Sequence, residues 1–225
     1  MANQLDLEEQ EQLDQLKHFW KQYGNAITWV LIVVLAGFAG WNFYQYWQRS
    51  QATQAAALFD EVERSVASAD PARMERVFAE MKDRFGGTIY AQQSALLVAR
   101  QLVAAGKPDA AKVSLTWLSE QAGEPGYQAL AKLRLASILM DGKSYDAALA
   151  LLNGAFPASF EGLVADRKGD VMSLKADKVK AIAEYERAYR LLDSRTEYRR
   201  LVEVKLNALG VDVQGPDQVA AATGK

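Results

Sequence analysis

The chain has 225 residues, a formal net charge of −2, one histidine and no cysteine. This length fits one anchor and one domain of ordinary size, and the lack of cysteine excludes disulfides, thiolate nucleophiles and cysteine zinc sites. The near-neutral charge argues against a nucleic-acid partner, which would require a basic face. From residue 50 on, alanine, leucine, glutamate, lysine, glutamine and arginine dominate, so the composition predicts helices.

Residues 1–23 form an N-terminal tail that is acidic at first and then basic and aromatic. Leu5, Leu13, Leu16 and Trp20 share one face of a helical projection, which favours a short amphipathic helix near a membrane surface. A solvated, partly disordered tail is an equally good interpretation of the same composition.

Residues 24–47 are predicted to form a transmembrane helix in a lipid bilayer. No charged side chain occurs between Lys21 and Arg49, and crossing the hydrocarbon core takes about 20 apolar residues. Aromatic rings crowd both ends of the segment, as in the interfacial belts of membrane helices. The residues expected to anchor the helix are Trp29, Gly37, Gly40, Trp41, Tyr44 and Trp47.

Two other interpretations of this segment are open. A buried core helix would normally keep one polar stripe, which is missing here. A cleaved signal peptide would have a short basic start, whereas a long acidic tail precedes this segment, and Gly37-Phe38-Ala39 is only loosely similar to a cleavage site. The sequence therefore favours an anchor that is retained.

The orientation of the anchor is predicted from the basic residues beside it. Lys17 and Lys21 precede the helix, and Arg49 alone follows it closely. The positive-inside rule then favours, by a narrow margin, a cytoplasmic N-terminus and a C-terminal domain outside the cytoplasm.

Residues 48–209 are expected to form a solenoid of helical hairpins. Small residues recur at the same place in three successive segments, with steps of 37 and 33 residues in two parallel series. A period near 34 residues is typical of tetratricopeptide repeats, whose paired helices approach closely where small side chains meet. A chance match within an alanine-rich bundle is the alternative. The two series are Ala99, Ala136 and Gly169 in the first helices and Ala111, Ala148 and Ala181 in the second.

Further helices are expected on both sides of these hairpins. One continues from the span to about Ser68, and another begins after Asp70-Pro71. A last helix, at about 197–209, is predicted to cap the stack, with Leu201, Val204, Leu206 and Leu209 on its inner face. Residues 210–225 are predicted to be a disordered tail.

No catalytic set is visible in the sequence. It lacks a glycine-rich phosphate loop, cysteine and paired histidines. Asp166 and Asp170 lie four residues apart and are suited to acid–base chemistry or calcium, but Arg167 and Lys168 beside them favour a solvated surface. The chain is therefore predicted to be no enzyme and to need no cofactor and no metal.

Stacked hairpins present a concave groove lined by the first helix of each hairpin. Flexible apolar side chains there would suit the loose capture of an extended peptide, although some of them are equally well interpreted as core. The predicted lining is Leu96, Arg100 and Val103, then Leu133, Ser137 and Met140, then Asp166, Asp170 and Ser173.

Three stretches carry a resemblance to a known family: "GWNFYQYW" at 40–47, "LRLASILMDGKSYDAAL" at 133–149 and "VADRKGD" at 164–170. Over nearly its whole length the chain resembles the ancillary SecYEG translocon subunits, the YfgM-like proteins. The resemblance implies a cytoplasmic N-terminus, one span of the bacterial inner membrane and a tetratricopeptide-like periplasmic domain. It also implies association with the SecYEG translocon and the periplasmic chaperone PpiD, and help in passing emerging, unfolded client polypeptides to periplasmic chaperones.

A second function class is a structural scaffold of the cell envelope, linked to division or to a stress response, that acts through repeat contacts. It would predict self-association through long heptads. The sequence shows no sustained heptad run. The family resemblance therefore favours the binding protein.

Overall fold

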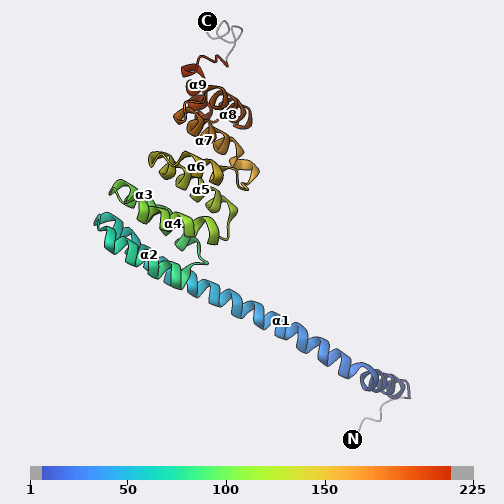
Figure 1. Ribbon diagram of the computed structural model, residues 1–225. Helices are drawn as coiled ribbons and strands as arrows, with labels where there is room; N and C mark the ends of the chain where they lie inside the picture. The colour runs from blue at the N-terminus through green and yellow to red at the C-terminus, as the bar shows by residue number, and fades with distance from the viewer. Residues whose placement is uncertain (1–6, 214–225) are drawn as a thin grey trace, which may run out of the picture. The chain divides into compact units, whose positions relative to one another are not determined.

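The computed structural model describes residues 7–213, and in these residues all regular structure is helical (Figure 1). The predicted all-α class is therefore confirmed. Residues 1–6 of the predicted tail and residues 214–225 of the predicted disordered tail lie outside the described residues. The chain divides into two compact units, Met1–Thr53 and Gln54–Lys225.

Helix α1 spans Leu7–Ala67 and makes up the described part of the first unit. Residues 7–23, for which the sequence left an amphipathic helix and a disordered tail open, are helical and belong to α1 together with the predicted span. The end of α1 near Ser68 is as predicted. Its last turns belong to the second unit, where Ala55, Val62 and Ser65 are fully buried.

The second unit continues as a series of short helices that lie side by side (Figure 1). The three predicted hairpins are α3 with α4, α5 with α6, and α7 with α8. The helices are α2 (Pro71–Phe85), α3 (Ile89–Ala104), α4 (Pro108–Gln121), α5 (Pro125–Asp141), α6 (Tyr145–Leu152), the short 3-10 helix η1 (Ala158–Phe160), α7 (Glu161–Leu174), α8 (Lys178–Leu191) and α9 (Glu197–Ala208).

The local sequence explains where these helices begin. Asp70 caps α2, since its carboxylate accepts hydrogen bonds from the backbone N–H groups of Ala72 and Arg73, and Pro71 occupies the first turn. Thr88 caps α3 in the same way through the N–H of Ala91. These caps satisfy backbone donors that have no partner inside the helix.

The turn inside each hairpin repeats with the predicted period. Gly106, Lys143 and Ala176 have φ values of 72°, 57° and 59° and follow one another in steps of 37 and 33 residues. Each occupies the left-handed position of a helix C-terminal motif, and the next N–H reaches back to the helix, as in Lys107 N to Leu102 O at 2.8 Å. The recurrence shows that the repeats agree in backbone geometry as well as in small residues.

Close helix approach at the small residues is confirmed. The five alanines of the two series are each at most 1% exposed. At Gly169 an added Cβ would lie 2.5 Å from the ring carbons of Tyr185, which is closer than packed atoms come. The buried side chains form three successive clusters: one joins the last turns of α1 to α2 through α5, one joins α5 to α7, and one joins α7 to α9.

Helix α9 is where predicted, but its inner face differs from the prediction. Val202 and Leu206 are fully buried, whereas Leu201 and Val204 are 47% and 63% exposed. The helix is turned so that Lys205 and Tyr198 contact acidic groups on α7. Val211 and Val213 still pack against the last cluster, so the described start of the predicted disordered tail is attached to the domain.

Candidate functional site

The predicted span is an apolar helix without a covering partner in the described part of the chain. From Ile27 to Trp47, the large apolar side chains are between 38% and 73% exposed. This helix is long and apolar enough to cross a membrane, and no residue of its most apolar window is buried. The buried-core interpretation is therefore wrong. A signal sequence would meet the same test of length and composition.

The polar side chains inside this segment bond to their own helix. Thr28 Oγ1 donates to the carbonyl oxygen of Gly24 at 2.7 Å, and Asn42 Nδ2 donates to that of Phe38 at 2.9 Å. An unsatisfied polar group costs several kcal/mol in a hydrocarbon environment, and such back-bonding removes much of that cost. The helix can therefore expose its whole circumference to lipid.

All six predicted anchor residues lie on the surface of α1. Trp29, Trp41, Tyr44 and Trp47 are about half to two-thirds exposed, and Gln48 Nε2 donates to the Tyr44 hydroxyl at 2.8 Å. A Cβ at Gly37 or Gly40 would meet no atom within 4 Å. The two glycines thus leave a shallow place on the helix that a second helix can approach.

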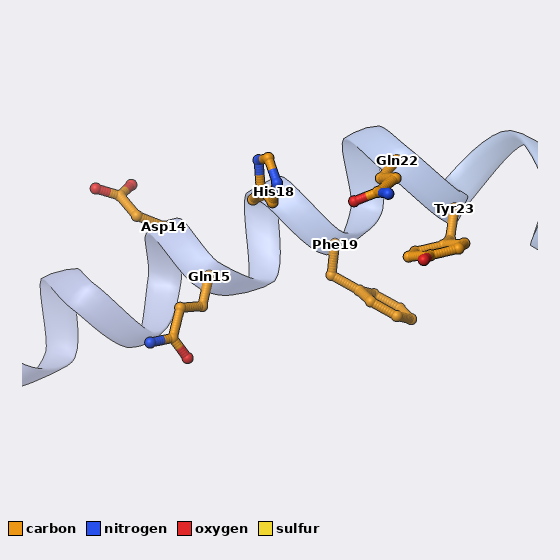
Figure 2. Close-up of a pocket in the computed structure, with 6 residues that line it drawn as sticks. All are labelled: Asp14, Gln15, His18, Phe19, Gln22 and Tyr23. Atoms are coloured by element: carbon orange, nitrogen blue, oxygen red, sulfur yellow. The ribbon is translucent and has the colours of Figure 1, made fainter.

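A hollow beside the N-terminal part of α1 does not have the features of a site. Its lining residues all come from one helix, so no second element encloses it (Figure 2). They are Asp14, Gln15, His18, Phe19, Gln22 and Tyr23. The rings of Phe19 and Tyr23 lie tilted against each other with their centroids 5.2 Å apart, so the aromatic residues of the hollow contact each other along one helix.

A groove of about 300 Å³ lies between α3 and α5, with α4 at its floor. Three of the predicted lining residues, Arg100, Val103 and Ser137, meet there. On the α5 wall the sequence predicted Ser137 but not Arg134, Ile138 and Asp141, although the four residues follow one another at helical spacing. Ala99 and Leu115 complete the lining.

The groove carries unbalanced charge. Arg134 Nη1 donates to the carbonyl oxygen of Leu96 at 3.2 Å, a neutral partner. Burial, and secondarily the nearby Arg100, lower the pKa of the Arg134 guanidinium from its usual value. Among the described residues, neither arginine has a carboxylate within the 4.0 Å of an ion pair, and neither does Asp141 have a cation.

Two of the apolar residues predicted for the groove belong to the core instead. Leu133 and Met140 are each 8% exposed and pack in the second cluster with Val164 and Val171. Leu133 and Met140 occupy the same repeat positions as Leu96 and Val103 on α3, but α7 packs against α5 and covers them. Leu96 is half-buried against the first cluster, and Ser173 is exposed at the end of α7.

The prediction that Asp166 and Asp170 lie on a solvated surface is wrong. The Asp166 side chain is fully buried, and that of Asp170 is 17% exposed. Lys205 Nζ lies 2.7 Å from Asp166 Oδ1 and 2.6 Å from Asp170 Oδ1. The hydroxyls of Tyr198 and Tyr185 donate to Asp166 and Asp170 at 2.6 and 2.8 Å. The two carboxylates therefore fasten α9 and α8 to α7.

The two tyrosines of this cluster are held in their neutral form. Burial above all, followed by the neighbouring Asp170, raises the pKa of Tyr185. Burial and the hydrogen bond to Asp166 raise the pKa of Tyr198. Both phenols thus act as hydrogen-bond donors, and the carboxylates are occupied by donors from within the fold. The arrangement serves structure, and it holds no free nucleophile or base.

Comparisons with known proteins match nearly the whole chain. A family model described as a tetratricopeptide repeat-like domain matches residues 17–211, which include the apolar helix. Three similar proteins are each named ancillary SecYEG translocon subunit. The one from Neisseria gonorrhoeae is 32% identical, over 90% of this chain and 98% of its own length. Those from Haemophilus influenzae and Escherichia coli are 29% and 24% identical, over 90% of this chain and 98% and 97% of theirs.

Proposed function

This chain belongs to the tetratricopeptide repeat-like family of ancillary SecYEG translocon subunits, and we propose that it is a non-catalytic, membrane-anchored binding protein that works beside the SecYEG translocon. The association with SecYEG is taken from the names of relatives that share 90% of this chain. The lack of free reactive groups in the Asp166 and Asp170 cluster supports a binding role.

The exposed apolar helix is the observation that carries this proposal. Full burial of one large apolar side chain is worth about 1.5–3 kcal/mol, and residues 24–47 expose many of them on every side. Lipid satisfies this surface, and the back-bonded Thr28 and Asn42 remove the main polar penalty. On this proposal the helix is a retained single span of the bacterial inner membrane, with residues 1–23 in the cytoplasm and residues 48–209 in the periplasm, as the basic Lys17 and Lys21 before it favour.

The mechanism is positional and includes no covalent step. Anchoring confines the repeat domain to a thin layer beside the membrane, which raises its effective concentration near emerging polypeptides. There it helps to pass unfolded clients from the translocon to periplasmic chaperones, with PpiD as a partner. The groove with Arg100, Val103 and Ser137 is the partner-binding surface.

Co-purification from solubilised membranes tests the association. The full chain is expected to co-purify with SecYEG, and a variant without residues 1–48 is expected not to. Photo-crosslinkers at Gly37 and Gly40 should also reach translocon subunits, because these glycines leave the helix surface open. A matched crosslinker at Val179, which is 79% exposed on α8, reports chance encounters. Undiminished co-purification of the truncated variant would refute the positional mechanism.

The topology is tested by single cysteines, because the natural chain has none. A membrane-impermeant maleimide should label Val179→Cys in intact spheroplasts and Lys17→Cys only after lysis. The mass of the membrane-bound protein should include residues 1–23, since the anchor is retained. Labelling in the reverse order, or a mature protein that begins after Ala39, contradicts the proposed topology.

A further inference from the structure

The groove between α3 and α5 carries charged side chains that form no ion pair with the described residues. We propose that it binds an extended segment of a partner protein that places a carboxylate side chain between Arg100 and Arg134. This inference rests on the proposed function only in taking the groove as the partner site, and it names the chemistry of the segment that the groove recognises.

The first argument is the missing counter-charge. Arg134 is half-buried, and its hydrogen bond goes to the neutral carbonyl of Leu96 rather than to an acid. Burying a charge is costly unless an opposite charge meets it, and Arg100 adds a like charge at the same place. A carboxylate would pair with both guanidinium groups in charge-assisted hydrogen bonds, which are the strong kind.

The second argument is the length of the groove. Its lining on α5 runs from Arg134 through Ser137 and Ile138 to Asp141. These end residues are seven apart, which is about 10 Å along a helix at 1.5 Å per residue. An extended peptide covers that distance with about three residues at roughly 3.3 Å each. Val103 and Ile138 supply apolar contacts between the charged ends.

The third argument is the opposite sign at the far end. Asp141 is exposed at the C-terminus of α5, where the helix dipole disfavours a carboxylate. It has no cation within ion-pair distance among the described residues. The groove therefore favours a segment with an acidic side chain at one end and a basic one about three residues away, and it disfavours a uniformly acidic segment.

The exposed lining of the groove is mostly apolar, with Val103 and Ile138 between the charged ends. Leu133 and Met140, two flexible apolar residues of α5, lie in the core and add nothing to it. Apolar contact therefore contributes affinity for any extended segment, whereas the arginines at one end and Asp141 at the other select among segments by charge.

The test uses the full chain in detergent and fluorescein-labelled peptides followed by anisotropy. The first peptide carries aspartate and lysine separated by two alanines, the second replaces the aspartate with asparagine, and the third replaces the lysine with glutamate. The first peptide should bind at least about tenfold more tightly than the second, as expected for a charge-assisted pair. Arg100→Glu should abolish this difference, whereas Arg76→Glu, an exposed arginine on α2, should keep it.

A second variant keeps the test decisive if Arg100→Glu folds poorly. Asp141→Lys should bind the third peptide at least about tenfold more tightly than the natural chain does, because the repelling carboxylate is gone. Equal binding of the first two peptides to the natural chain would overturn the proposal, and so would equal effects of Arg100→Glu and Arg76→Glu.

Other occupants of the groove give distinct results that also overturn the proposal. A reduced, unfolded apolar protein that displaces the labelled first peptide from the natural chain, and that binds Arg100→Glu equally well, would identify the groove as a client site. Self-association that Arg100→Glu removes would identify a second copy as the occupant. Translocon co-purification is a separate readout. If the chain co-purifies with SecYEG but peptide binding does not depend on charge, only this inference fails. If peptide binding depends on charge but the chain does not co-purify with SecYEG, only the proposed function fails.

Discussion

The junction of α3 with α5 and the junction of α7 with α9 occupy corresponding places in the stack. The first brings two like charges together, whereas the second pairs opposite charges. Arg100 and Asp170 follow the same repeat spacing on α3 and α7. At α7 the charge is met by Lys205 from α9, which lies 2.6 Å from Asp170 Oδ1. At α3 the charge is met by Arg134 from α5, a residue of the same sign, and a groove stays open.

The junction of α5 with α7, between these two, is closed by apolar residues such as Leu133, Met140 and Val171. Two junctions are thus sealed, one by hydrophobic contact and one by opposite charges. The remaining junction keeps a like-charged pair that does not favour folding. Local conflict of this kind in an otherwise consistent fold is where function is expected.

The largest effect is expected from Lys205→Met in the junction of α7 with α9. The substitution keeps the length of the side chain but leaves Asp166 without a cation and Asp170 with Arg167 alone, whose Nη1 lies 3.1 Å from Asp170 Oδ2. Removing one partner of a buried pair costs about 3–5 kcal/mol, and Tyr198 and Tyr185 still bond the carboxylates, so we expect about 3 kcal/mol. Native-state hydrogen exchange of the α9 amides should then accelerate by about 100-fold.

The matched control is Lys180→Met on α8. Lys180 Nζ lies 2.8 Å from Asp177 Oδ2, but its side chain is 67% exposed. An exposed ion pair contributes little, so α9 exchange should stay as in the natural chain. Equal acceleration in both variants would show that the buried cluster is no more important to the fold than a surface pair.

The alkaline titration of the cluster gives a second large effect. Tyr185 and Tyr198 have pKa values raised above the ordinary value of 10.0 by burial and by the aspartates that accept their hydrogen bonds. The stability that they contribute is therefore fully present below pH 10 and is lost as the pH rises through their raised values. In absorbance titration, the difference between the natural chain and Tyr185→Phe/Tyr198→Phe should show tyrosinate forming only above pH 10. A difference centred at or below pH 10 contradicts the buried cluster.

A smaller effect is expected at Gly169, whose equivalent in the open junction is Ala99. Ala99 lines the groove, whereas Gly169 lets the Tyr185 ring lie directly on α7. Gly169→Ala should lose about 1 kcal/mol in urea unfolding, because overpacking costs 1–3 kcal/mol and the gain in helix propensity returns up to about 1 kcal/mol. Gly126→Ala on α5, whose Cβ would meet only Phe160 at 4.0 Å, is the control and should cost nothing.

The sequence predicts the repeat architecture because its determinants are local and periodic. The steps between small residues, the Asp70-Pro71 start and the long uncharged segment each depend on neighbours within one hairpin or one helix. Even the left-handed turns at Gly106, Lys143 and Ala176 follow that period. Spacing along the chain was therefore sufficient to place these elements.

The sequence does not predict the charged clusters, because they join residues far apart in the chain. Lys205 and Asp166 are 39 residues apart, and the apolar Leu201 and Val204 favour the wrong face of α9. The groove prediction included Arg100 and Val103 on α3 and Ser137 on α5, but it missed Arg134 and Asp141 on α5. Which junction stays open depends on the side chains that the next helix brings, and the pattern of a single helix does not contain that information.

The smallest expected effect tests whether the like-charged pair at the α3–α5 junction lowers the stability of the fold while it enables ligand binding. Arg100→Glu places a carboxylate beside Arg134, so the α3–α5 junction acquires the opposite charges that close α7 and α9. Because residue 100 is exposed, the gain should be only about 0.5 kcal/mol, a rise in the free energy of unfolding measured by urea denaturation. The same substitution is expected to abolish the aspartate preference in peptide binding. A variant that gains stability while losing recognition would show that the like-charged pair is kept for its ligand, whereas a loss of stability would mean that the two arginines already support the fold.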